Sequence, residues 1–189
     1  MTQRYARRQI RLSGLSALLE DYRLDNYETL EPWQESALAK AREYAEDPGK
    51  SWFYIFGSPG TGKSHLCTAV CGALLEAGAA VRYMLWRDVS RELKALTNDS
   101  AGFGEAIRPY KAADVLYIDD FLKGGTTEAD MRLAFELLNS RYNARKPTLL
   151  SSELSIDDVL DLDEAVGSRI YERAKGYVIH ANGQNWRLR

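Results

Sequence analysis

The stretch IFGSPGTGKSH, residues 55–65, decides the fold. Its central part follows the pattern G-x-x-x-x-G-K-[ST] at every position, which is typical of a loop that cradles the phosphates of a nucleotide. Gly60 and Gly62 allow the backbone to curl so that successive N–H groups point at a β-phosphate. The residues predicted to bind the nucleotide here are Gly57, Ser58, Pro59, Gly60, Thr61, Gly62, Lys63, Ser64 and His65.

The chemistry of the loop depends on its last two motif residues. Lys63 is expected to reach the β- and γ-oxygens, and the Ser64 hydroxyl is expected to ligate Mg²⁺. A second run, VLYIDD at residues 115–120, ends in two acids. We expect Asp119 to hold Mg²⁺ and Asp120 to orient or deprotonate the attacking water. The predicted cofactors are ATP and Mg²⁺, with Lys63 and Asp120 in catalytic roles.

Short apolar runs alternate with helical patterns along most of the chain. Runs that are apolar on both faces suit a parallel sheet buried between helices. The predicted strands are 52–56, 81–86, 115–118, 148–151 and 177–180. Strand alternating with helix predicts an α/β three-layer sandwich with a five-stranded, mostly parallel sheet and right-handed crossovers.

The first 28 residues differ from the rest of the chain. Arg4, Arg7, Arg8 and Arg11 occur there with no acid among the first eleven residues, and only a short apolar patch follows. We interpret residues 1–28 as a basic arm or linker, either ordered by a partner or a solvated tail. Residues 29–189 form the predicted ATPase domain, without a separate lid domain.

Composition narrows the class of protein. The net charge of −2 gives no global attraction to nucleic acid, so a contact with DNA must use a local patch. No run approaches the ~20 apolar residues of a membrane span, and the start lacks the pattern of a secretory signal. We expect a cytoplasmic protein with no membrane contact. Cys67 and Cys71 have no second pair to complete a metal site and are interpreted as packing residues.

Many classes of protein share the phosphate loop. A small-molecule kinase needs an arginine-rich lid, but no compact arginine cluster follows Asp120. A GTPase needs an N-K-x-D segment that reads guanine, and the sequence has none. The paired acids favour an ATPase that activates water.

Several further stretches resemble one family of such ATPases. They are GSPGTGKSHL at 57–66, the Asp-Asp run, LLNSRYNARKPTLLSS at 137–152, GSRIYER at 167–173 and GQNWRLR at 183–189. In this order they resemble the AAA+ helicase-loader family, which includes the DnaC and DnaI loaders and the IstB transposition ATPases. The resemblance implies an AAA+ fold, a homo-oligomer, and single-stranded DNA and a replicative helicase as partners.

The resemblance also implies roles for individual positions. Ser151-Ser152-Glu153 falls where the family has its first sensor, which usually ends in asparagine, so Ser152 takes the predicted catalytic role. The carboxylate of Glu153 would be repelled by a phosphate unless it is protonated, turned away or bound to a cation. Arg169 and Arg173 match the arginine-finger region, which acts in trans on a neighbouring subunit. Arg187 matches the second-sensor arginine, which acts in cis on the nucleotide.

Three functions stay open on these grounds. The first is an ATP-dependent loader that binds single-stranded DNA and delivers a replicative helicase. The second is an IstB-like helper of a transposase, and the third is a non-hydrolysing ATP-binding adaptor. Lys123, Arg141 and Tyr142 are candidates for contact with a DNA strand, the alternative being a core role for Tyr142 and an acid partner for Arg141.

Overall fold

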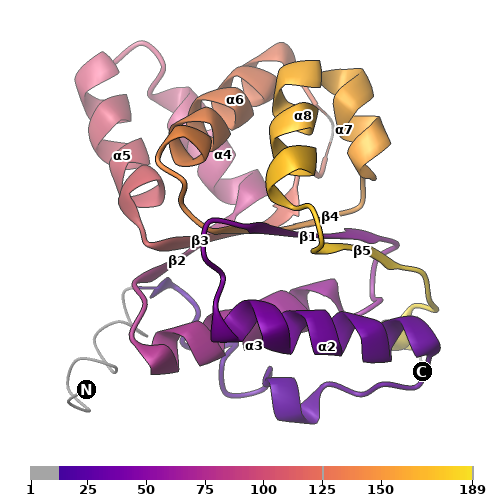
Figure 1. Cartoon of the computed structure of the whole chain (residues 1–189). Helices are drawn as coiled ribbons and strands as arrows, with labels where there is room; N and C mark the ends of the chain where they lie inside the picture. Colours follow the sequence, from indigo (N-terminus) through magenta and orange to yellow (C-terminus); the bar gives the residue numbers. More distant parts are fainter. Residues whose placement is uncertain (1–12, 125, 189) are drawn as a thin grey trace.

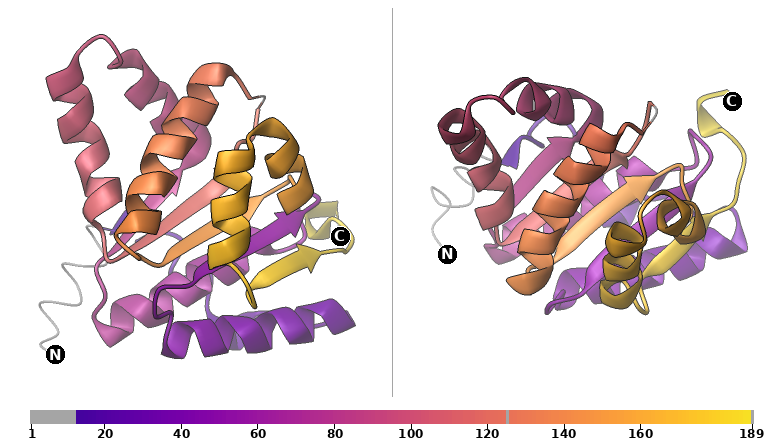
Figure 2. Two further views of the ribbon diagram at one scale, coloured as in Figure 1. Left: turned by 45° about the horizontal axis from the view of Figure 1, so that its top comes forward. Right: turned by 90° about the horizontal axis from the view of Figure 1, so that it is seen from above.

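The sheet is the centre of the molecule, and the computed structural model describes it within residues 13–124 and 126–188. In this part of the chain five strands form one sheet between two layers of helices (Figure 1). They are β1 (Trp52–Gly57), β2 (Val81–Leu85), β3 (Val115–Phe121), β4 (Thr148–Ser152) and β5 (Val178–Ala181). Their order is β2-β3-β4-β1-β5, and every neighbouring pair is parallel (Figure 2). The predicted three-layer α/β sandwich is confirmed.

The helices divide unequally between the two faces of the sheet. One face carries α2 (Pro32–Glu46) and α3 (Lys63–Ala77). The other carries α4 (Trp86–Ala95), α5 (Ser100–Ala112), α6 (Glu128–Asn143), α7 (Ile156–Leu162) and α8 (Glu164–Arg173) (Figure 1). Two short 3₁₀ turns, η1 (Leu24–Asn26) and η2 (Trp186–Leu188), lie near the ends of the described chain.

Strand β1 shows why the apolar runs form a buried sheet. Side chains alternate between the two faces of a strand. Trp52 and Tyr54 accordingly pack into the core beneath α4–α8, whereas Phe53 and Ile55 pack into the core with α2 and α3. All four side chains are fully buried. A run that is apolar at every position therefore suits a strand covered on both faces.

The strand ends differ from the prediction by one residue in β1, β2, β4 and β5 and by three residues in β3. Trp86 begins α4 instead of ending β2, and its buried ring packs edge-on against Phe121 with 5.1 Å between centroids. Strand β3 continues through both acids to Phe121, although its register with β4 shifts between Ile118 and Phe121. Pairing with β4 thus extends β3 beyond the apolar run that predicted it.

The described part of the predicted arm packs against the α2–α3 layer. Leu15 is fully buried, and Tyr27 belongs to the same core as α3. The arginines Arg4, Arg7, Arg8 and Arg11 lie outside the described residues. A division of the chain at residue 28 stays a prediction, but residues 13–28 rest on the ATPase domain. None of the described helices has both the length and the apolar character that crossing a bilayer requires.

Candidate nucleotide-binding site

The phosphate loop joins the end of β1 to the start of α3. Gly60 and Gly62 have φ values of +76° and +93°, a conformation that glycine adopts without strain. Space is a second constraint, because a Cβ at Gly60 would lie 1.8 Å from Oδ1 of Asn185. The N–H of Trp186 donates to the Gly60 carbonyl at 3.0 Å. The C-terminal segment therefore rests directly on the loop.

Lys63 is held over the loop by backbone carbonyls. Its ammonium donates to the carbonyl oxygens of Gly57 and Ser58, each at 2.7 Å. The side chain is buried, and burial lowers the pKa of Lys63. An ammonium with so little water around it interacts strongly with an incoming phosphate. The N-terminus of α3, which begins at this residue, adds its positive dipole end.

Ser64 and Asp119, the two residues predicted to hold Mg²⁺, are in contact. The Ser64 hydroxyl donates to Asp119 Oδ1 at 2.9 Å, although 55 residues separate them. Tyr83 donates its hydroxyl to the other carboxylate oxygen at 3.2 Å. The described residues hold no cluster of three or more His, Cys, Asp or Glu side chains for a metal. One hydroxyl and one carboxylate nevertheless suit Mg²⁺, which takes its remaining ligands from phosphates and water.

Asp120 lies beside this pair in an unusual backbone conformation. Its φ of +53° is uncommon for a residue with a side chain and marks strain of the kind found at functional sites. Its N–H donates to Asp119 Oδ1 and to Ser151 Oγ, each at 3.1 Å. These bonds fix the strained peptide, so that the Asp120 carboxylate lines the cavity in front of the phosphate loop.

The structure brings Ser151 to the acids, a residue given no role from the sequence. Its hydroxyl donates to Asp119 Oδ1 and accepts from the N–H of Asp120. Ser152 instead donates to the Phe121 carbonyl at 2.8 Å and is fully buried. This placement contradicts the catalytic role predicted for Ser152, because neighbouring residues of a strand point to opposite faces.

Glu153 is bound to a cation. Lys123 Nζ lies 2.8 Å from Glu153 Oε1 and 3.2 Å from Asp120 Oδ2. The sequence allowed Glu153 to be protonated, turned away or paired with a cation. The structure shows the third arrangement, an ion pair with Lys123. Lys123, predicted as a DNA contact, thus lies in the nucleotide cavity.

The cavity in front of the loop has a volume of about 440 Å³. The N-terminal segment forms one wall, where the Tyr22 ring stacks on His65 with 4.7 Å between centroids. Nε2 of His65 lies 3.0 Å from Oδ1 of Asn26. His65 therefore joins α3 to this wall. Lining residues that the sequence did not reveal are Asp21, Tyr22, Asn26, Tyr27, Glu28, Gln34 and Trp186.

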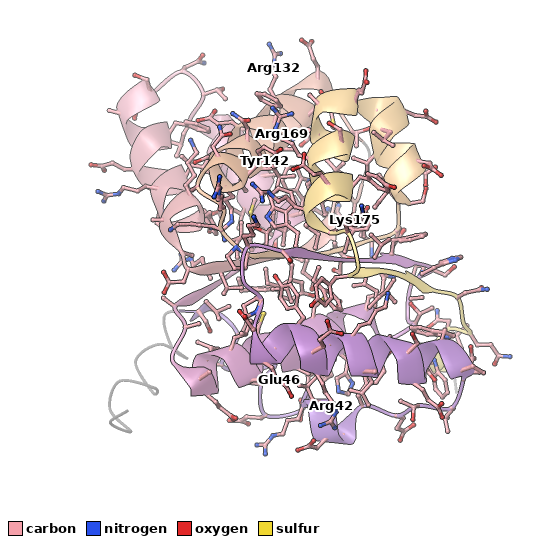
Figure 3. All side chains as sticks on the ribbon, in the orientation of Figure 1. Arg42, Glu46, Arg132, Tyr142, Arg169 and Lys175 are labelled. Carbon is pink, nitrogen blue, oxygen red and sulfur yellow. The ribbon has the colours of Figure 1, made fainter. Side chains whose placement is uncertain are left out.

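The predicted arginine fingers lie elsewhere, since both are on α8, and Figure 3 shows Arg169 between α6 and α8. Arg169 donates to Asn139 Oδ1 at 3.1 Å, and Arg173 donates to the Tyr142 carbonyl at 3.0 Å. Their guanidinium groups lie 5.5 and 4.5 Å from the centre of the Tyr142 ring. Neither arginine lines the described cavity of its own chain. The Arg187 side chain lies outside the described residues.

The prediction that Arg141 faces DNA is wrong. The side chain is fully buried, and its guanidinium donates to Thr148 Oγ1 at 2.8 Å and to backbone carbonyls. Tyr142 is partly covered, since its ring contacts the two arginines of α8 and its hydroxyl donates to Glu172 at 2.7 Å. Arg141 therefore has no exposed surface for a nucleic acid strand, whereas a DNA contact through the half-buried Tyr142 stays a prediction.

A phosphate loop, a paired serine and aspartate, and the strand order of this sheet define an ATP-binding P-loop protein of the AAA+ class. Residues 1–189 match the model of the IstB-like ATP binding protein family, and the chain belongs to that family. Its relatives include the DnaC helicase loaders, so the wider group is that of DnaC- and IstB-like ATPases.

Individual relatives agree with this assignment. The chain is 37% identical over 152 residues to the phage-like element PBSX protein XkdC of Bacillus subtilis, covering 77% of this chain and 56% of XkdC. It is 26% identical over 166 residues to the replicative helicase loader DnaC of Escherichia coli, covering 86% of this chain and 66% of DnaC. The chain thus spans only about half to two thirds of these relatives. The crystal structure of DnaI superposes with a TM-score of 0.77 at 22% identity, covering 94% of this chain and 98% of DnaI, and supports the fold.

Proposed function

We propose that this protein is an ATPase that loads a replicative DNA helicase onto single-stranded DNA. The observation that carries the proposal is the contact between Ser64 and Asp119 beside the phosphate loop. It supports the proposal because a hydroxyl and a carboxylate lie side by side next to the phosphate loop, and the Asp120 carboxylate lines the same cavity as Lys63. The loader role follows from similarity to the Escherichia coli protein described as a replicative helicase loader.

In the proposed reaction each residue has a distinct task. Lys63 exchanges its carbonyl partners for oxygens of the β- and γ-phosphates, while Ser64 and Asp119 hold the metal. Mg²⁺ held by these two groups would neutralise charge on the phosphates. Asp120 orients the attacking water and accepts its proton. Ser151 keeps the Asp119 carboxylate and the Asp120 peptide in place.

We further propose that the active site is completed by a second copy of the chain. Arg169 and Arg173 lie outside the cavity of their own subunit, so they act on the phosphates only from a neighbour. An arginine supplied in trans contributes about 10³-fold or more to phosphoryl transfer in other P-loop enzymes. The isolated subunit is then a slow ATPase. Arg187 is proposed to contact the nucleotide in cis.

Two alternatives rest on specific observations. The family match favours an IstB-like helper of a transposase, with the same ATPase and a different partner. The ion pair between Lys123 and Asp120 favours a non-hydrolysing adaptor, because a paired carboxylate is a weaker base. The paired acids and the strained Asp120 peptide favour hydrolysis over the adaptor.

The experiment measures ATP turnover with and without single-stranded DNA, and identifies by mass spectrometry the protein retained from a lysate of the host. Turnover stimulated by DNA, with a helicase retained, supports the loader. Lys63→Ala is expected to weaken ATP binding by about tenfold or more, which is 1.4 kcal/mol. Asp120→Asn is expected to bind ATP but to lose roughly 10²-fold in turnover. A retained transposase identifies the second function, and ATP binding without turnover in every assembly identifies the adaptor.

A further inference from the structure

Lys123 is fixed at the edge of the nucleotide cavity by a tight turn after β3. Leu122 and Gly124 on either side have φ values of +60° and +99°. The N–H of Lys123 donates to the Asp120 carbonyl at 3.0 Å, which folds the turn back on the strand. This bend directs the side chain toward the carboxylates of Asp120 and Glu153.

The charges around the cavity explain what a second lysine does there. Asp21 and Glu28 line the wall that the N-terminal segment forms. Beside the phosphate loop lie two cations, Lys63 and Lys123, and three carboxylates, Asp119, Asp120 and Glu153. Their formal sum is −1, and it would be −2 without Lys123. A triphosphate is itself strongly negative. Lys123 therefore offsets the repulsion that Glu153 and Asp120 exert on its terminal phosphate.

The lysine remains charged and has room to move. The hydrogen bond to Glu153 raises the pKa of Lys123. The side chains of Lys123 and Glu153 are 38% and 36% exposed. Both line the nucleotide cavity and also a second cavity of about 460 Å³ on their other side. A flexible four-carbon stem can thus swing its ammonium between carboxylate and phosphate without leaving the site.

We infer that Lys123 binds the γ-phosphate of ATP and makes the cavity prefer ATP to ADP, with Glu153 holding the ammonium when that phosphate is gone. This inference rests on the proposed function, because it assumes that ATP fills the cavity. It gives Glu153 a role at the first-sensor position, where the helicase-loader family usually has asparagine. It also separates the two lysines, since Lys63 serves both nucleotides and Lys123 only the triphosphate.

The test compares dissociation constants for a non-hydrolysable ATP analogue and for ADP, each with Mg²⁺, by calorimetry. Lys123→Met is expected to lose about tenfold in affinity for the ATP analogue. Its affinity for ADP should stay within about twofold, which also shows that the variant folds. Lys123→Arg should keep most of the preference for ATP because it keeps the charge. The matched control is Lys111→Met, which removes an ion pair of the same 2.8 Å length from the surface, with Glu136.

Glu153 provides the decisive comparison. Glu153→Gln should strengthen binding of the ATP analogue and leave ADP unchanged, because the lysine loses its competing partner. The double variant Lys123→Met, Glu153→Gln restores the formal charge of the cavity but lacks the contact, so its affinity for the ATP analogue should stay below that of the wild type.

Three outcomes would overturn the inference. If the double variant bound the ATP analogue as tightly as the wild type, Lys123 would only neutralise the charge of Glu153. Equal losses of affinity for the ATP analogue and for ADP in Lys123→Met would show that Lys123 does not contact the γ-phosphate. The proposed function would be unaffected by that result. A wild-type chain that binds neither nucleotide would overturn the proposed function, and this inference with it.

Discussion

Replacing Arg141 by methionine tests whether the buried guanidinium is a structural group. The change keeps an unbranched side chain but removes every donor. In the folded protein the guanidinium connects the end of α5 to the start of β4. Its acceptors are the Thr148 hydroxyl and the carbonyl oxygens of Tyr110, Ala113 and Pro147.

The expected loss follows from the carbonyl groups left behind. Three partly buried carbonyl groups lose a charged donor, although Pro147 keeps the N–H of Leu116 and Ala113 keeps the ammonium of Lys146. A hydrogen bond within a protein contributes a net of about 1 kcal/mol. Removing a charge from the interior recovers part of this cost, since burial lowers the pKa of Arg141 to about 10. Taking about 1 kcal/mol for each of the three lost carbonyl bonds, we expect the free energy of unfolding to fall by about 3 kcal/mol. For a domain of this size the melting temperature should drop by roughly 6–12 °C.

Equilibrium unfolding in urea measures the loss, with the slope m checked for constancy. The matched control is Arg132→Met on the same helix, where the side chain is 72% exposed and its ion pair with Glu128 spans 3.5 Å. This control should change stability by less than about 0.5 kcal/mol. A loss below about 1 kcal/mol in Arg141→Met, together with weaker binding of single-stranded DNA, would refute the reasoning and restore the DNA contact.

Three more predictions concern the site and its assembly. Ser151→Ala should lower ATP turnover about tenfold with nucleotide binding retained, whereas Ser152→Ala should chiefly lower the melting temperature; the reverse pattern would return the sensor role to Ser152. Burial lowers the pKa of His65 below its ordinary 6.5, so the unfolded chain takes up the proton more readily and stability should fall as the pH drops below about 6.5. A His65→Asn variant with the same pH dependence would show that another group is responsible. Mixed Arg169→Ala and Lys63→Ala subunits, each inactive alone, should recover some ATP turnover, and no recovery in a proven mixed oligomer would exclude Arg169 as the finger.

The phosphate loop shows what a contiguous stretch of sequence can determine. The motif at 57–64 predicts its own structure, because each glycine is needed by the local backbone and the lysine and serine follow within the same turn of chain. The helix from Pro32 to Glu46 has ends of the same local kind, since proline occupies its first position and an Asp-Pro-Gly segment follows its last. Runs apolar on both faces likewise required a sheet covered on both sides.

The placements that the sequence did not reveal depend on contacts between distant parts of the chain. Arg141 and Lys123 are polar residues whose neighbours in sequence give no sign of burial or of a partner. Thr148 and the α5 carbonyls surround Arg141 only after β4 has paired in the sheet. Lys123 reaches Glu153 only because β3 and β4 end side by side. A local pattern could not distinguish these positions from a solvent-exposed cationic surface.

The sequence by itself thus determined the class of fold, the phosphate loop and the two acids, because short-range backbone geometry and hydrophobic periodicity encode them. The tertiary structure alone decided which serine meets Asp119. Strand β4 lies between β1 and β3, and its register places Ser151 opposite Ile55 with its hydroxyl on the acid. It also decided that Trp186 lines the cavity together with five residues far from it in sequence, Asp21, Tyr22, Asn26, Tyr27 and Glu28. Strand order and register arise from packing of the whole domain, so they cannot be predicted from residues that are neighbours in sequence.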